Sequence, residues 1–125
     1  MRTRLYGLYG ITNQSLLTDL PTLSVAVSQA LRGGMRLLQY RAKGLPAAER
    51  LRQAKVLQQL CAEHDALFII NDDVELAASV GADGVHLGRE DADCARARER
   101  LGDEAIIGVS CYNDFSRAEA ATGAG

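Results

Sequence analysis

Short apolar runs alternate along the chain with longer segments of helical periodicity. The runs have the length and composition of buried strands, and they cover residues 5–11, 36–41, 66–70, 84–87 and 105–110. After the first run, apolar residues recur at helical spacing from Leu23 to Leu31, and Gly33-Gly34 follows as a helix stop. Such alternation predicts a parallel sheet whose strands are joined by right-handed helical crossovers.

The later helices are marked by their own apolar faces and start signals. The second helix starts around Pro46, which is tolerated in a first helical turn, and has an apolar face between Leu51 and Cys61. Two shorter helices and a final one are predicted over residues 73–80, over residues 92–101 and from Ser116 onward. No linker or low-complexity stretch separates these elements, so a single folding unit is expected.

Two architectures fit this order, an open doubly wound sheet and a (β/α) barrel. The first strand of a nucleotide-binding doubly wound fold usually runs into a G-x-G-x-x-G turn, but residues 10–14 read GITNQ. A barrel is therefore preferred. Because a complete barrel takes about 250 residues, about five βα units are expected here. Residues 1–125 are predicted to be the N-terminal portion of a single, incomplete TIM-type α/β barrel domain.

Composition narrows the class of partner. The chain has 125 residues and a formal net charge of -2, so no overall positive field attracts nucleic acid or an acidic membrane, and small molecules are the expected partners. Cys61, Cys94 and Cys111 form no Cys-x-x-Cys pair, which argues against a disulfide framework or a zinc knuckle. No stretch approaches the about 20 apolar residues of a membrane helix, and no signal peptide is evident. A soluble, cytoplasmic protein is expected.

Cations gather where the second predicted strand ends. Gln39, Arg41 and Lys43 are spaced at i, i+2 and i+4, so an extended backbone directs all three to one face, whereas Tyr40 points to the helices. A rigid guanidinium and a mobile ammonium suit a diphosphate. The alternative is that these are ordinary solvated charges at a strand end.

Carboxylates follow the next two strands. Asn71 and Asp72 come directly after the third, and Asp91 stands at a helix start after the fourth. Each has an equally good structural explanation as a helix cap, since Asp72 with Glu75 resembles a capping box. Barrel enzymes nevertheless keep their active sites at this rim. Magnesium commonly uses one or two carboxylates with substrate phosphate oxygens, so Asp72 and Asp91 are candidate Mg²⁺ ligands.

Three further residues complete the sequence-based hypotheses. Ser110 ends the fifth strand on the same rim, where its hydroxyl could bind substrate or relay a proton. His86 lies inside a short strand and is interpreted as a hydrogen-bonded core histidine rather than a base. Cys111 has no histidine at a recognisable offset and is interpreted as a packed thiol.

Four stretches at these strand ends closely resemble the thiamine-phosphate synthase family. They are LLQYRAK, FIINDDVELA, GADGVHLGREDA and IIGVSCYN, at residues 37–43, 68–77, 81–92 and 106–113. The stretches occur in the family's order and together are far more specific than any one of them. The resemblance covers essentially the whole chain but only a little over half of the family's barrel.

The resemblance implies a reaction and a role for each matching residue. In the family, a hydroxymethylpyrimidine diphosphate loses diphosphate with the help of magnesium, and the nitrogen of a thiazole phosphate captures the resulting cation. Carried over by position, the diphosphate would be held by Arg41, Lys43 and Asn71, and Mg²⁺ by Asp72 and Asp91. Gln39 would contact the pyrimidine, and Ser110 would lie near the reacting centre.

Two local departures and one large one qualify this carry-over. The family usually has an acidic residue at Ala42 and glutamine at Arg89. Its later strands supply a further lysine and the glycine-rich cradle for the thiazole phosphate, and residues 1–125 contain neither. Two alternatives stay open. One is the related thiazole tautomerase, which needs no diphosphate site, and the other is a non-catalytic half-barrel that forms a homo-oligomer through its exposed edges.

Overall fold

The structure is a computed structural model that describes residues 8–12, 19–42, 44–88 and 91–109, without the side chains of residues 91–93 and 109. It contains a five-stranded parallel sheet in the order β1-β2-β3-β4-β5. In chain order the elements are β1 (Leu8–Ile11), α1 (Leu20–Arg32), β2 (Met35–Tyr40), α2 (Ala47–Glu63), β3 (Leu67–Asn71), α3 (Val74–Val80), β4 (Gly84–Leu87), α4 (Asp91–Leu101) and β5 (Ile106–Val109).

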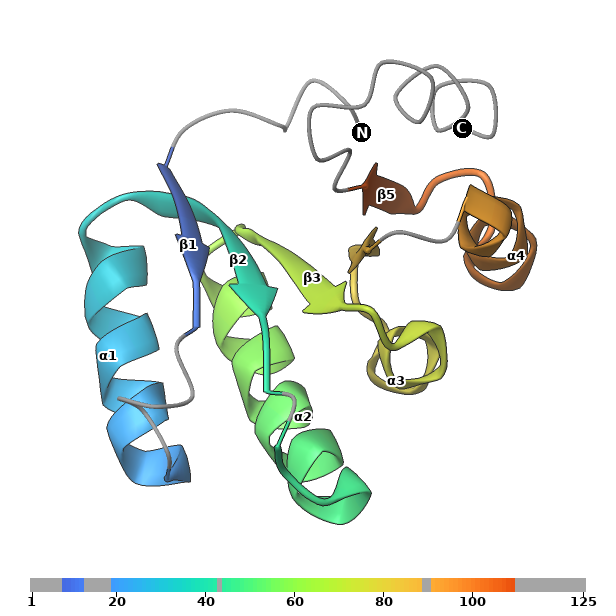
Figure 1. Cartoon of the computed structure of the whole chain (residues 1–125). Coiled ribbons are helices and arrows are strands. Elements are labelled where there is room, and N and C mark those ends of the chain that lie inside the picture. The colour runs from blue at the N-terminus through green and yellow to red at the C-terminus, as the bar shows by residue number, and fades with distance from the viewer. Residues whose placement is uncertain (1–7, 13–18, 43, 89–90, 110–125) are drawn as a thin grey trace.

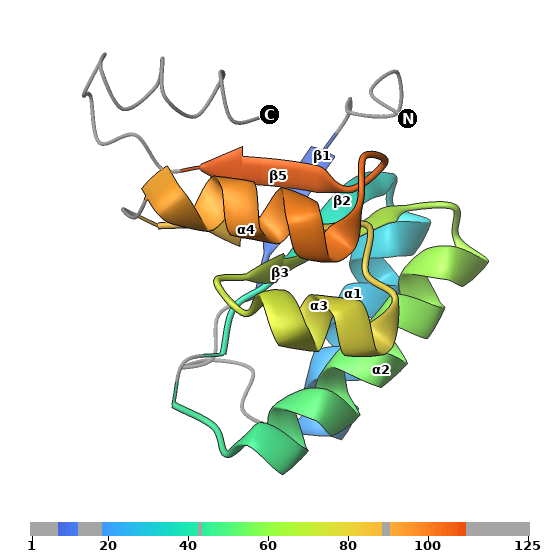
Figure 2. The same cartoon turned by 90° about the vertical axis from the view of Figure 1, so that its right-hand side faces the viewer.

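The strand order decides between the two architectures. A doubly wound sheet reverses its strand order at a switch point, whereas here each strand pairs with the next one along the chain. The sheet curves, and all four described helices lie on its outer side (Figures 1 and 2). The predicted incomplete (β/α) barrel is thereby confirmed. The first strand was predicted from residue 5 and is described from Leu8, and the other strand limits agree with prediction to within one residue; the helix predicted from Ser116 lies outside the described residues.

The helix limits follow from local chemistry. Asp19 caps α1 by accepting a hydrogen bond of 2.8 Å from the backbone N–H of Thr22. Gly34, at a φ of 109°, then turns the chain into β2. Pro46 was predicted just inside the second helix but immediately precedes it, because α2 begins at Ala47. None of the described helices is both long and apolar enough to span a membrane.

The main core lies between the sheet and the helices. Alternate strand residues point outward into it, and they are Leu38, Tyr40, Phe68, Ile70, Val85 and Leu87. Tyr40 donates a hydrogen bond of 2.6 Å to Oε1 of Gln53 in α2, which confirms that it faces the helices. Burial raises the pKa of Tyr40 to about 12, so its hydroxyl keeps the proton that it donates.

A group of hydrogen bonds joins neighbouring strands where β4 begins. The Asp83 carboxylate accepts a hydrogen bond of 2.8 Å from the backbone N–H of Phe68 in β3, and its carbonyl accepts one of 2.9 Å from Ile106 in β5. Gly84 follows, and its backbone lies directly against the carbonyl of Ile106. These contacts therefore hold β3, β4 and β5 together at the end of the sheet opposite to the rim with the polar residues.

Candidate functional site

Several polar side chains share the inner face of the sheet near its carboxyl end. Gln39 is in register with Ile69, and Asn71, two residues further along β3, is in register with His86 of β4. Because residues in register share a face and alternate residues do too, all three polar residues lie on the face opposite to Tyr40. This is the face to which Gln39, Arg41 and Lys43 were predicted to point.

Two predicted site residues are in direct contact. Asn71 donates from Nδ2 to Oε1 of Gln39 over 3.0 Å, and Gln39 donates from Nε2 to the hydroxyl oxygen of Tyr9 over 2.6 Å. The chain of hydrogen bonds crosses β3, β2 and β1. Gln39 is only 3% exposed, and both polar ends of its buried carboxamide have a hydrogen-bond partner. Sequence reasoning did not select Tyr9 as a site residue. Strand alternation places it on the same inner face as Ile11, two residues later, and this could have indicated it.

Thr12 fixes the backbone from which Arg41 projects. Its hydroxyl accepts a hydrogen bond of 2.9 Å from the N–H of Arg41 and donates one of 3.2 Å to the carbonyl of the same residue. The Thr12 N–H also donates to the carbonyl of Gln39 over 3.0 Å. The Arg41 side chain is exposed, and among the described residues no carboxylate forms an ion pair with it. An exposed guanidinium that projects from a fixed backbone is well suited to bind an anion.

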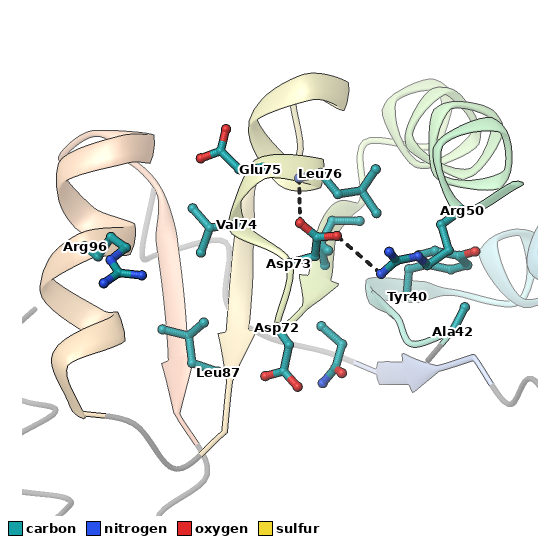
Figure 3. A pocket seen from close by; sticks show the side chains of 12 residues that line it. Tyr40, Ala42, Arg50, Asp72, Asp73, Val74, Glu75, Leu76, Leu87 and Arg96 are labelled. Atoms are coloured by element: carbon teal, nitrogen blue, oxygen red, sulfur yellow. Dashed lines mark hydrogen bonds and ion pairs between the residues drawn. The ribbon is translucent and has the colours of Figure 1, made fainter. Parts of the chain in front are cut away.

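Adjacent aspartates at the end of β3 have different roles. Asp73 is the cap of α3, since its carboxylate accepts from the N–H of Leu76 over 2.9 Å, and it forms an ion pair of 3.3 Å with Arg50. The capping-box interpretation of Asp72 and the cap interpretation of Asn71 are therefore wrong. Figure 3 shows Asp72 and Asp73 pointing in opposite directions. Asp72 has a left-handed φ of 63°, which turns its exposed carboxylate away from the helix start.

Replacing the cap should affect stability without changing the charge of Asp72. We expect Asp73→Ala to lower the free energy of unfolding by about 1 kcal/mol, because the N–H of Leu76 loses its acceptor. Urea unfolding followed by circular dichroism measures this change. Asp73→Asn is the matched control, since asparagine caps equally well but loses the ion pair with Arg50. A loss of stability as large in Asp73→Asn as in Asp73→Ala would assign the effect to the ion pair instead.

His86 belongs to this face and not to the core, which corrects its sequence-based interpretation. Its side chain is half-buried, and a Cβ added to Gly108 of β5 would lie 2.8 Å from its Nδ1. Burial lowers the pKa of His86, the charge of Asp72 opposes this shift and that of Arg41 adds to it. The imidazole is therefore neutral at pH 7. The backbone N–H of Asp72 donates to the carbonyl of His86 over 2.8 Å, which places Asp72 directly beside this residue.

A groove lies beside these residues, between the carboxyl ends of the strands and the starts of the helices. Its volume is about 730 Å³, and charged residues of both signs line it, including Arg50, Asp72, Glu75 and Arg96 (Figure 3). The Asp72 carboxylate is also near Gly88, since a Cβ added there would lie 3.7 Å from its Oδ1. Gly88 lies three residues before Asp91, which is the first residue of α4. The backbone thus brings Asp72 close to Gly88, three residues before Asp91 in the sequence.

The remaining predicted site residues, or their side chains, lie outside the described part of the structure. Lys43 and Ser110 lie outside the described residues, as do Arg89 and Cys111, and the side chain of Asp91 is not described. Within the described part of the chain, no group of three or more histidine, cysteine, aspartate or glutamate side chains is arranged to hold a metal ion. Magnesium does not require such a group, because one or two carboxylates with water and phosphate oxygens suffice. The exposed carboxylate of Asp72 is a donor of the required chemistry.

Comparison with known proteins gives a consistent result. The family model described as thiamine monophosphate synthase matches residues 8–125. The thiamine-phosphate synthase of Chromobacterium violaceum is 55% identical over 125 residues, which are 100% of this chain and 59% of the relative. That of Aromatoleum aromaticum is 53% identical over 123 residues, covering 98% of this chain and 58% of the relative.

A solved structure agrees with the sequence matches. Thiamine phosphate pyrophosphorylase from Pyrococcus furiosus superimposes with a TM-score of 0.84 at 39% sequence identity. The match covers 99% of this chain and 58% of that one. The chain therefore spans less than two thirds of the length of these relatives, and within that span both the sequence and the fold are similar.

Proposed function

This chain belongs to the thiamine monophosphate synthase family, and we propose that it contributes the pyrimidine-diphosphate part of a synthase active site. The reaction joins a hydroxymethylpyrimidine diphosphate to a thiazole phosphate and releases diphosphate. Residues 1–125 would be the N-terminal portion of a single barrel domain in a soluble, cytoplasmic enzyme of thiamine biosynthesis. The observation that supports this most strongly is that Arg41, Asn71 and Asp72 gather at one rim of a barrel sheet.

The proposed chemistry follows from where charge develops. As the bond between the pyrimidine methylene carbon and the diphosphate oxygen breaks, negative charge accumulates on the leaving group. Donors held in advance at that position stabilise the transition state more than the bound substrate. This negative charge would be stabilised by Arg41, whose backbone is fixed by Thr12, and by Asn71, with help from Lys43. The thiazole nitrogen then forms a bond to the methylene carbon, near Ser110.

The donor set is compatible with magnesium. Asp72 would hold the ion with Asp91, because its exposed carboxylate faces away from the cap and lies near Gly88, shortly before Asp91. When bound, Mg²⁺ would add positive charge beside the departing diphosphate. Gln39, held between Tyr9 and Asn71, would contact the pyrimidine ring.

Turnover by a longer protein is the direct test of this function. We call a polypeptide that carries residues 1–125 and spans the full length of the relatives the full-length polypeptide. Mixed with both substrates and magnesium, it should form thiamine phosphate, detected by chromatography. Residues 1–125 alone should not, since they span 59% of a related enzyme. Absence of product from the full-length polypeptide would contradict the proposed function, and rapid turnover by residues 1–125 would contradict the need for the remainder.

The two alternatives make different predictions. A thiazole tautomerase would act without the pyrimidine diphosphate, so product formation that depends on both substrates excludes it. An assembly of half-barrels would pair at the edge of β1, where Leu8 is 65% and Ile11 is 56% exposed. Light scattering of residues 1–125 measures this association, and a stable monomer would count against obligate pairing.

A further inference from the structure

The hydrogen-bond chain at the centre of the site has a defined direction. Gln39 uses its carbonyl oxygen toward Asn71 and its amide nitrogen toward Tyr9, so both ends of the carboxamide are engaged. Asn71 donates from its own amide nitrogen, and only the oxygen of Gln39 can accept that hydrogen bond. The nitrogen of Gln39 then faces Tyr9, whose hydroxyl oxygen accepts its hydrogen bond.

Without the Tyr9 hydroxyl, the Gln39 carboxamide would be held from one side only. A hydroxyl can accept from an amide nitrogen or donate to an amide oxygen, so Asn71 decides which end of the carboxamide faces Tyr9, and the Tyr9 hydroxyl holds that end in place. The side chain of Gln39 is 3% exposed, which leaves little water to replace a lost partner. Tyr9, by contrast, is 48% exposed and sits on the edge strand, where its ring adds little to the main core.

We propose that Tyr9 is a positioning residue that holds the Gln39 carboxamide in place and thereby fixes the hydrogen-bonding pattern offered to a planar nitrogen heterocycle. This inference rests on the proposed function for the identity of the ligand. Tyr9 acts through Gln39, because its recorded hydrogen bond is to that side chain. The position of the carboxamide matters for recognition of the ring and not for the departure of the diphosphate. Loss of the hydroxyl should therefore change KM and leave kcat nearly unaffected.

A double-mutant cycle in the full-length polypeptide tests this mechanism. Tyr9→Phe should raise KM for the pyrimidine diphosphate about tenfold, and kcat should change by less than about twofold. Gln39→Met removes the carboxamide at similar volume. In that background, Tyr9→Phe should change KM by less than about twofold, because no carboxamide is left for Tyr9 to hold. An equal change in both backgrounds, or none in the native background, would overturn the proposal.

A readout independent of activity separates this inference from the proposed function. The side-chain amide signals of Gln39 in a ¹⁵N–¹H spectrum are assigned by their loss in Gln39→Met. Tyr9→Phe should shift these two signals strongly, since Nε2 loses its acceptor at 2.6 Å. If the full-length polypeptide proves inactive, a shift still supports the positioning role while the proposed function fails. Unchanged signals would overturn the positioning role whatever the activity.

Tyr40→Phe is the matched control. It also removes one hydroxyl and one hydrogen bond of 2.6 Å to a glutamine side chain, but on the helix-facing side of β2. Tyr40 is 3% exposed, so this change should lower the melting temperature by several degrees and leave KM unchanged. The opposite pattern is expected for Tyr9→Phe. A rise in KM as large in Tyr40→Phe as in Tyr9→Phe would attribute the effect to general loosening of β2 and overturn the proposal.

Discussion

Replacing Asp72 by asparagine in the full-length polypeptide is expected to lower kcat by about 100-fold or more, the range for losing one pre-placed electrostatic group in an active site. The change removes the negative charge that would hold magnesium at the end of β3. Steady-state turnover measured across a range of magnesium concentrations checks it. The magnesium concentration for half-maximal rate should rise as well, because Asp91 would then provide the only carboxylate of the proposed pair.

Asparagine is chosen because of the backbone at this position. Asp72 has a φ of 63°, a region that asparagine tolerates and alanine does not, so Asp72→Ala would mix charge loss with strain. The matched control is Asp73→Asn, which removes the neighbouring charge and keeps a residue able to cap α3. Its turnover should stay within about threefold of the native value. Equal losses in both variants would show that net charge at this rim, and not Asp72 itself, controls the rate.

The elements of the fold could be predicted because two periodicities dominate the sequence. Buried strands give continuous apolar runs, and helices on one side of a sheet give stripes, so Leu23 to Leu31 and the run at 66–70 were both identified correctly. The barrel could be preferred because GITNQ replaces a phosphate-binding turn. The register between strands, by contrast, depends on contacts between distant segments, and a list of residues does not contain it.

The site could be located from the sequence but not fully assigned. Gln39 and Asn71 were recognised as candidates, and their direct contact emerged only from the pairing of β2 with β3. Two neighbouring aspartates compete for one cap, and the left-handed turn at Asp72 gives that role to Asp73. His86 was interpreted as a core residue because it lies within a short strand, and the sequence does not show which face of that strand packs against the helices. Strand alternation alone cannot tell them apart.

Because side chains alternate along each strand, the residues that stabilise the fold and those of the proposed site lie on different faces of the sheet. Residues that face the helices, such as Phe68 and Val85, are almost fully buried and form the core. Residues that face inward near the carboxyl end, such as Asn71, form the proposed site. The amino end of the same strands is fixed by Asp83 and its neighbours, far from the polar rim. Substitutions at the two ends should therefore separate into losses of stability and losses of activity.

The largest effect on stability is expected at that amino end, in Gly84→Ala. A Cβ at this position would lie 1.8 Å from the carbonyl oxygen of Ile106, a backbone atom that cannot move unless β5 moves. The two residues are in register, so the added methyl group forces β4 and β5 apart where their pairing begins. Overpacking of this kind costs about 1–3 kcal/mol, and here the loss of strand pairing adds to it.

Thermal unfolding of the full-length polypeptide, followed by circular dichroism, measures the cost of this substitution. Gly33→Ala is the matched control, because Gly33 has a φ of -79° and its added Cβ would meet its nearest atoms at 3.5 Å, an ordinary contact distance. We expect the control to melt within about 2 °C of the native protein, and Gly84→Ala to melt at least about 6 °C lower or to fail to fold. Equal melting temperatures for the two variants would mean that β5 can shift to accommodate a methyl group. In that case Asp83, and not the close approach of Gly84, would hold the two strands together at this end of the sheet.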